Sequence, residues 1–155
     1  MKRVVVVEGD LLEQRVDVIV NPWNRNIIPW WLLLPQGVSG AIKRRAGYAP
    51  FFELGRMGPI ALGEAVLTGP GRLPFKAIIH VAGINMWWRS SAQSIQGSVR
   101  SAMRMAAGQG FASLAFPLIG AGTGGFGEDG TLALMLQALE PLQGDVAVTI
   151  VRFRR

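Results

Sequence analysis

The sequence predicts one α/β domain, a sandwich whose central β-sheet is largely parallel. Its 155 residues fit a single domain of ordinary size. Half of the residues are hydrophobic and 17% are charged, which indicates a buried core and argues against disorder. Short apolar runs alternate with helical patterns along the chain. No internal repeat or interdomain linker is visible, so we expect one domain over residues 1–155.

Two apolar runs near the start predict the first strands. Residues 3–7 are rich in valine, residues 16–20 form a second run, and each is bounded by polar or turn residues. Neither alternates strictly between polar and apolar residues, so both are predicted to be central strands covered on both faces. Four later runs also predict strands: residues 63–68, 76–81, 114–118 and 145–153.

Residues 21–37 predict a long loop, because Pro22, Pro29 and Pro35 interrupt it. Helical composition or spacing follows in four segments: residues 39–45, 50–54, 91–109 and 131–139. Because strands and helices alternate from here on, the strands are expected to run mostly parallel.

The composition excludes several kinds of site. Without cysteine the chain has no disulfide, no thiolate metal ligand and no cysteine nucleophile. His80 is the only histidine and cannot form a zinc site alone. No cluster of Asp and Glu suggests a hard metal, so neither a metal nor a cofactor is predicted.

The start of the chain lacks the apolar core and cleavage site of a secretory signal. The longest apolar stretch, residues 27–34, contains Pro29 and is far shorter than the ~20 residues of a membrane span. We therefore expect a cytoplasmic protein without membrane contact. A net charge of +6 and a pI near 11.1 favour phosphate-bearing partners, either nucleic acid or a small diphosphate.

A glycine-rich segment is the first candidate for a site. Residues 120–125 match G-x-G-x-x-G between a predicted strand and a predicted helix, and successive N–H groups there can bind an anion. Its position excludes a Rossmann fold, since only one strand follows and Glu140 stands where a helix closes. No Gly-Lys-Ser/Thr follows, which excludes a P-loop. A surface loop is the alternative, but five glycines within residues 120–127 favour phosphate binding.

Six segments resemble the macro domain family, in that family's order. They are Gly9-Asp10-Leu11, Val16-Asp17-Val18-Ile19-Val20-Asn21-Pro22-Trp23-Asn24, Gly37-Val38-Ser39-Gly40-Ala41-Ile42, Gly63-Glu64-Ala65-Val66-Leu67-Thr68, Ile78-Ile79-His80-Val81-Ala82-Gly83 and Phe116-Pro117-Leu118-Ile119-Gly120-Ala121-Gly122. The resemblance covers nearly the whole chain. It implies a three-layer α/β/α sandwich with a mixed, largely parallel sheet. It also implies binding of ADP-ribose, or a related derivative, in a cleft between residues 21–38 and residues 120–127.

The resemblance also implies roles for single residues. Asp10 would accept a hydrogen bond from the adenine amino group, with the Leu11 backbone nearby. Asn24 would bind the distal ribose, which makes it the tentative catalytic residue. Phe153 would flank adenine. The diphosphate would lie between two sets of residues: Gly37 and Val38 on one side, and Gly120, Ala121, Gly122, Thr123, Gly124, Gly125 and Phe126 on the other.

Structural alternatives stand beside these roles. Asp10 is equally suited to cap a helix or turn, and Asn24 to form a turn. Phe153 fits a strand that is part of the core. His80 is expected to be a structural residue of its strand.

The chain departs from the family pattern at three places. Residues 27–34 contain an apolar insertion, which is expected to act as a lid, as a homo-oligomer contact, or as extra core. Pro35-Gln36-Gly37 replaces a glycine triplet. Ser39 stands where hydrolytic members carry an aspartate, and Gly124 where many carry an aromatic residue.

Three functions follow as hypotheses. The first is binding of free ADP-ribose or of ADP-ribosylated protein. The second is hydrolysis of ADP-ribose esters, either O-acetyl-ADP-ribose or ADP-ribosylated protein. The third is RNA binding, through basic groups near exposed tryptophans. Ser39 and Gly124 favour binding over catalysis, because serine is not a base near neutral pH. Whether the protein is an enzyme is left open.

Overall fold

The structure, a computed structural model, describes residues 3–32, 37–84, 90–119 and 126–154. Six strands form one sheet in the order β1-β6-β5-β2-β4-β3. All neighbouring strands pair in parallel except β3 and β4, which are antiparallel. The sheet is therefore mixed and largely parallel, as predicted. The strands are β1 (Val4–Gly9), β2 (Val18–Trp23), β3 (Ala65–Thr68), β4 (Ala77–Ala82), β5 (Ser113–Pro117) and β6 (Ala147–Phe153).

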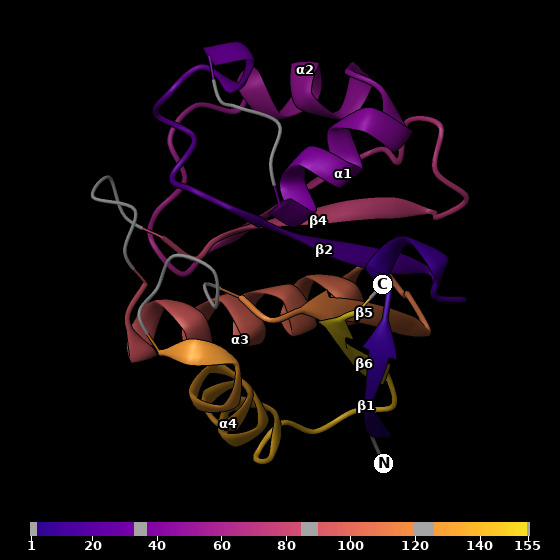
Figure 1. Ribbon diagram of the computed structural model, residues 1–155, viewed down its shortest axis with the longest axis vertical. Coiled ribbons are helices and arrows are strands. Elements are labelled where there is room, and N and C mark those ends of the chain that lie inside the picture. The colour runs from indigo at the N-terminus through magenta and orange to yellow at the C-terminus, as the bar shows by residue number, and fades with distance from the viewer. Residues whose placement is uncertain (1–2, 33–36, 85–89, 120–125, 155) are drawn as a thin grey trace.

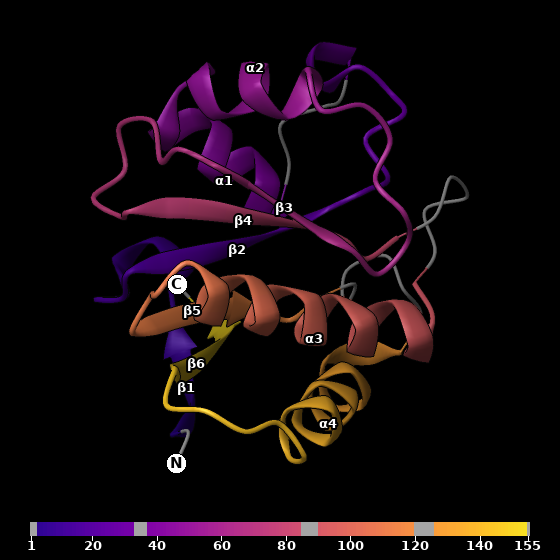
Figure 2. The same cartoon turned by 180° about the vertical axis from the view of Figure 1, so that it is seen from behind.

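The helices lie on both faces of the sheet and complete the three predicted layers. The four α-helices are α1 (Gly37–Ala46), α2 (Ala49–Gly55), α3 (Ala92–Gly108) and α4 (Gly127–Leu139). Two short 3-10 helices, η1 (Leu11–Glu13) and η2 (Trp30–Leu32), interrupt the loops. Helices α1 and α2 cover one face, while α3 and α4 cover the other (Figures 1 and 2).

Two apolar clusters fill the spaces between the layers. Successive residues of a strand point to opposite faces, so Ile19 packs towards α1 and α2, whereas Val20 packs towards α3 and α4. Ile78 and Ile79 of the adjacent β4 divide in the same way, and all four side chains are fully buried. This double burial explains why these strands read as continuous apolar runs.

The prediction that the first strand is central is wrong. Strand β1 lies at the edge of the sheet, and β6 is its one partner among the described strands. Val5 and Val6 are 39% and 42% exposed, respectively. A β-branched run fits an extended backbone, but whether it is covered depends on the neighbours that the topology provides.

The predicted loop also begins too early. Strand β2 continues through Pro22 to Trp23 and pairs with β4 over this length. Proline lacks the N–H group that a central strand needs. Among the described residues, however, β5 pairs with β2 only at Val18 and Ile19. Pro22 therefore lies where β2 has a single partner strand.

The helices α1 and α4 begin at Gly37 and Gly127, earlier than the predicted residues 39 and 131. Both glycines have positive φ, at 65° and 72°, which turns the chain into the helix. Within the described part of the chain, no helix is long and apolar enough to cross a membrane.

Candidate functional site

The predicted ligand-binding residues that the structure describes lie towards one edge of the sheet, where the parallel strands end. Asp10 follows β1, Asn24 follows β2, and Phe153 is the last residue of β6. In open α/β sheets, ligands bind beyond this carboxyl edge. The loop after β5 reaches the same edge, but the predicted residues Gly120, Ala121, Gly122, Thr123, Gly124 and Gly125 lie outside the described residues.

Asp10 and Phe153 lie at neighbouring strand ends. Gly9 pairs with Phe153, and the Arg154 backbone N–H donates to the Gly9 carbonyl at 3.0 Å. Phe153 is 56% exposed, so its ring is available at the surface and is not part of the core.

The cap predicted as an alternative for Asp10 is present. Its Oδ1 accepts a hydrogen bond from the Leu12 backbone N–H at 2.9 Å, at the start of η1. Leu11 is buried in the apolar cluster beneath α1 and α2, so only its backbone could contact a ligand.

Asn24 forms the turn predicted as its alternative role. Its Oδ1 accepts a hydrogen bond from the Asn26 N–H at 2.7 Å, and the residue is 8% exposed. Within the described parts of the chain, its Nδ2 amide group has no hydrogen-bond partner. The turn therefore fixes the side chain, and no described residue accepts from its Nδ2.

Asn26 holds the loop after β2 in place and was not predicted from the sequence. It has a left-handed backbone, with φ of 60°. Its Nδ2 donates to the carbonyls of Leu54 and Gly58 at 2.7 and 2.9 Å. Its Oδ1 accepts from the Trp23 indole at 3.2 Å. The asparagine itself is a turn signal, but no sequence pattern marks bonds to residues about 30 positions away.

The start of α1 offers backbone N–H groups at the same edge. Gly37 is exposed, and Val38 is half-buried against the apolar cluster. The first N–H groups of a helix have no partner within it and form its positive end. Ser39, in this first turn, donates its hydroxyl to Asn21 Oδ1 at 2.7 Å and lies 3.2 Å from the Pro22 carbonyl.

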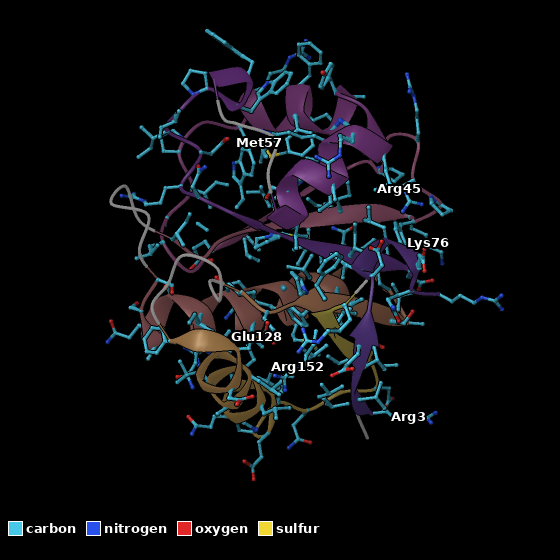
Figure 3. The ribbon with its side chains drawn as sticks, in the orientation of Figure 1. Arg3, Arg45, Met57, Lys76, Glu128 and Arg152 are labelled. Atoms are coloured by element: carbon cyan, nitrogen blue, oxygen red, sulfur yellow. The ribbon has the colours of Figure 1, made fainter. Side chains whose placement is uncertain are left out.

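Phe126 directly precedes α4 and is 41% exposed. The first turn of α4 carries Glu128 and Asp129, which pair with Arg152 of β6 at 3.2 and 3.1 Å (Figure 3). Glu128 also pairs with Arg154 at 3.2 Å. Hydrogen bonds from Arg154 and Arg152 lower the pKa of Glu128. These carboxylates offset the positive charges of Arg152 and Arg154.

His80 is a structural residue of β4, as expected. It is fully buried, with Nδ1 2.9 Å from Asn21 Nδ2 and Nε2 2.8 Å from Thr68 Oγ1. Burial lowers its pKa from 6.5 to about 3, so the ring is neutral near neutral pH.

The apolar insertion is partly extra core. Trp30 packs against Tyr48 and Phe52 of the α2 region, with ring centroids 5.4 and 5.2 Å apart. Trp31 is 67% exposed and Ile27 is 42% exposed. Residues 33 and 34 of the insertion lie outside the described residues.

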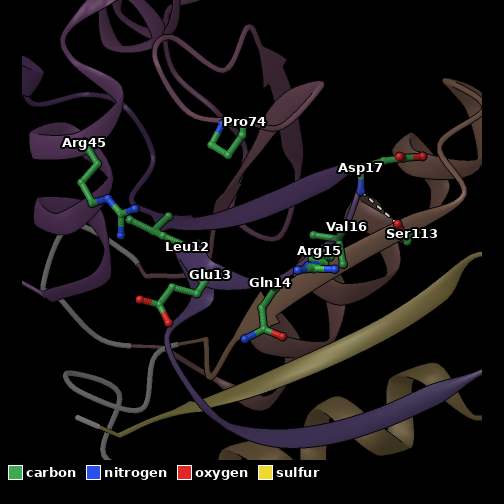
Figure 4. Close-up of a pocket in the computed structure, with 9 residues that line it drawn as sticks. All are labelled: Leu12, Glu13, Gln14, Arg15, Val16, Asp17, Arg45, Pro74 and Ser113. Atoms are coloured by element: carbon green, nitrogen blue, oxygen red, sulfur yellow. Dashed lines mark hydrogen bonds between the residues drawn. The ribbon is translucent and has the colours of Figure 1, made fainter.

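A hollow of about 600 Å³ lies beside η1 and the starts of β2 and β5 (Figure 4). Its lining residues are Leu12, Glu13, Gln14, Arg15, Val16, Asp17, Arg45, Pro74 and Ser113. None of the predicted ligand-binding residues is among them. Asp17 donates its N–H to Ser113 Oγ at 2.9 Å, and its Oδ2 accepts from the Ala112 N–H at 2.7 Å. The polar groups here thus hold the starts of β2 and β5.

Comparison with known proteins agrees with the fold and with the motifs. The Macro domain family profile matches residues 20–135. The O-acetyl-ADP-ribose deacetylase of Enterobacter sp. (strain 638) is 37% identical over 131 residues, covering 80% of this chain and 69% of that protein. A macro domain-containing protein of Listeria monocytogenes is 38% identical over 130 residues, covering 79% and 70%, respectively.

Solved structures of macrodomains also resemble this fold. The Oceanobacillus iheyensis macrodomain with ADP superposes with a TM-score of 0.82 at 27% identity, covering 98% of this chain and 83% of that one. A mutant of that macrodomain with ADPR also gives 0.82, at 26% identity, covering 97% and 84%. The chain belongs to the macro domain family.

Proposed function

We propose that this protein binds ADP-ribose, free or attached to protein, at the carboxyl edge of its sheet. The observation that carries the proposal is the joint placement of Asp10, Phe153, Asn24 and the start of α1 at that edge. Strands β1 and β2 are separated by β6 and β5, so their ends lie roughly 14 Å apart at the usual strand spacing. That span accommodates a ligand with a base at one end and a second sugar at the other.

At the adenine end, Asp10 and Phe153 divide the recognition between them. The cap uses Asp10 Oδ1, which leaves Oδ2 to accept from the adenine amino group. The exposed Phe153 ring offers a face on which the base can stack.

The diphosphate would lie across the start of α1. Backbone N–H groups after Gly37 and the positive end of the helix favour an anion there. The glycines of residues 120–127 would cover the other side, with Phe126 at their end. The net charge of +6 adds a long-range attraction.

At the distal ribose, Asn24 would donate its Nδ2 to a sugar hydroxyl. Its fixed turn means that little side-chain entropy is lost on binding. The Oceanobacillus iheyensis structures with ADP and with ADPR support this kind of ligand.

Titration calorimetry with ADP-ribose tests the proposal. Asp10→Asn retains the cap oxygen but presents an amino group to adenine, so affinity should fall about tenfold while stability is kept. Asn24→Ala should also weaken binding. If the wild type gives no heat at high micromolar protein, the proposal is wrong.

A second candidate is hydrolysis of ADP-ribose esters. It is favoured by the relatives named O-acetyl-ADP-ribose deacetylase, at 36–37% identity. Asn24 would position the ribose, and the bound diphosphate would help orient a water molecule. The Ser39 hydroxyl donates into the protein and is not a base.

Incubation with O-acetyl-ADP-ribose and with an ADP-ribosylated protein distinguishes the two functions. Hydrolysis that is lost in Asn24→Ala supports the enzyme. If both substrates stay intact while the wild type binds ADP-ribose, the protein is a binding module only.

A further inference from the structure

Four polar side chains form one hydrogen-bonded chain across the sheet. Ser39 Oγ lies 2.7 Å from Asn21 Oδ1, Asn21 Nδ2 lies 2.9 Å from His80 Nδ1, and His80 Nε2 lies 2.8 Å from Thr68 Oγ1. Asn21, His80 and Thr68 are 0%, 0% and 3% exposed. Ser39, on α1, is half-buried. It is the end of this hydrogen-bonded chain that lies at the carboxyl edge of the sheet.

These four side chains can satisfy all of their hydrogen-bond donors and acceptors in two arrangements, which we call settings. In the first, Ser39 donates to Asn21, Asn21 to His80 Nδ1, His80 Nε2–H to Thr68, and Thr68 to the Gly69 carbonyl at 3.0 Å. In the second every bond is reversed, and Ser39 donates to the Pro22 carbonyl at 3.2 Å. A buried imidazole, carboxamide or hydroxyl is costly when unpaired, so the groups must change setting together.

The structure has the first setting. The Asn21 amide places Nδ2 against His80 and Oδ1 against Ser39. His80 Nδ1 then accepts, and its proton is on Nε2. Burial keeps the ring neutral, and with the Asn21 Nδ2 donor facing Nδ1 a protonated ring would have no acceptor for it.

In both settings the hydrogen of the Ser39 hydroxyl points into the protein. We propose that Ser39 is a specificity-determining residue of the ligand site, which offers only acceptor lone pairs to the ligand. It therefore selects a hydrogen-bond donor, namely a ribose hydroxyl or a bound water molecule. Asn21, His80 and Thr68 are positioning residues that impose this polarity. The choice of ligand rests on the proposed function, whereas the polarity of the chain does not.

The first test is the tautomer of His80, read by long-range ¹⁵N–¹H NMR. Since the protein has a single histidine, the spectrum is unambiguous. The wild type should carry its proton on Nε2 at pH 8. A proton on Nδ1 would show that the chain runs in the opposite direction and would overturn the assignment.

The second test reverses the hydrogen-bonded chain from its Ser39 end. In Ser39→Asp a carboxylate cannot donate, so Asn21 must turn its Nδ2 outward and His80 must move its proton to Nδ1. Ser39→Ala leaves the Thr68 end intact and should keep Nε2–H. Gln109→Asp adds the same charge at the exposed residue that caps the end of α3 and should also keep it.

A third variant covers the case in which Ser39→Asp does not fold. Thr68→Val conserves the shape but removes the acceptor of Nε2–H, and a buried unpaired N–H is strongly disfavoured. It should shift the proton to Nδ1. If the folded variants Ser39→Asp and Thr68→Val both keep Nε2–H, the four groups are not coupled and the proposal fails.

Binding tests the role in recognition. Ser39→Ala should weaken ADP-ribose binding about five- to tenfold, and Ser39→Thr, which keeps the hydroxyl, should restore it to within about twofold. If Ser39→Ala binds like the wild type, Ser39 does not recognise the ligand. If the wild type does not bind ADP-ribose at all, the proposed function and this recognition both fail, while the tautomer result still decides the polarity of the chain.

Discussion

The ring of Phe51 meets the imidazole of His80 edge-on, with centroids 5.9 Å apart and planes at 72°. This contact closes the side of His80 that faces α2, so water does not reach the ring. An imidazolium in such a place would lose its hydration. Folding therefore favours the neutral imidazole of His80.

The first prediction is a loss of stability in mild acid. Burial lowers the folded pKa of His80 to about 3, whereas its unfolded value is near 6.5. Between these values the unfolded state binds more protons, so stability rises with pH. The contribution is complete above pH 6.5 and is lost progressively as the pH falls towards 3. From pH 7 to pH 5 the free energy of unfolding should drop by about 2 kcal/mol on account of His80.

Urea unfolding at the two pH values measures this drop. An NMR titration of the folded protein isolates its cause, because only one histidine is present. The ring signals should not move between pH 8 and pH 5. A folded-state midpoint near 6.5 would contradict the prediction.

The second prediction concerns Gly71, which has a φ of 60°. A Cβ added there would collide with the Ala46 carbonyl oxygen and lie 3.0 Å from Pro50 Cδ. That carbonyl is held by a hydrogen bond from the Arg72 N–H at 2.9 Å. Gly71→Ala combines backbone strain with overpacking and should cost about 3 kcal/mol or more.

Gly58→Ala is the matched control. Its φ of 75° is similar, but nothing lies within 4 Å of the added Cβ. It should cost about 1 kcal/mol, from backbone strain alone. Equal losses for the two variants, measured by urea unfolding, would show that the collision at Gly71 is relieved.

The layers of this fold follow from patterns that are local in sequence. Ile19 and Ile78 lie in apolar runs, and each run is long enough for a strand but too short for a helix. The place of a strand in the sheet is not local. The valines of β1 resemble those of a buried strand, yet the topology puts them at an edge.

At the candidate site, too, local sequence marks some residues, whereas the tertiary fold decides others. Asp10 and Asn24 follow strands and match a family motif, so the sequence marks both as candidates and their ligand roles stay predictions. Asn26 could not, because its partners Leu54 and Gly58 reach it only through the tertiary fold. The chain from Ser39 to Thr68 was missed for the same reason, since it links four separate elements.

The third prediction tests Asn26. Asn26→Asp keeps the tolerance for a left-handed backbone and the acceptor for the Trp23 indole. It replaces the amide donor with an oxygen that faces the carbonyls of Leu54 and Gly58. We expect a loss of about 3 kcal/mol, because two partly buried acceptors lose their partner and face a negative charge. Urea unfolding measures it, with Gln109→Asp as the control for charge. A loss below about 1 kcal/mol would mean that water replaces both bonds.

The last prediction separates the two tryptophans of the insertion. Trp30 packs against Tyr48 and Phe52, and its Cδ1 would lie 3.2 Å from a Cβ added at Gly55. Trp30→Ala should therefore cost about 2 kcal/mol of stability, less than a fully buried tryptophan would. Trp31 is 67% exposed, so Trp31→Ala should stay within about 0.5 kcal/mol. Gly55→Ala leaves both side chains in place but pushes Trp30 off α2, and its cost should lie between these two. Should Trp31→Ala instead destabilise the protein as much as Trp30→Ala, the exposed half of the insertion must be covered in solution.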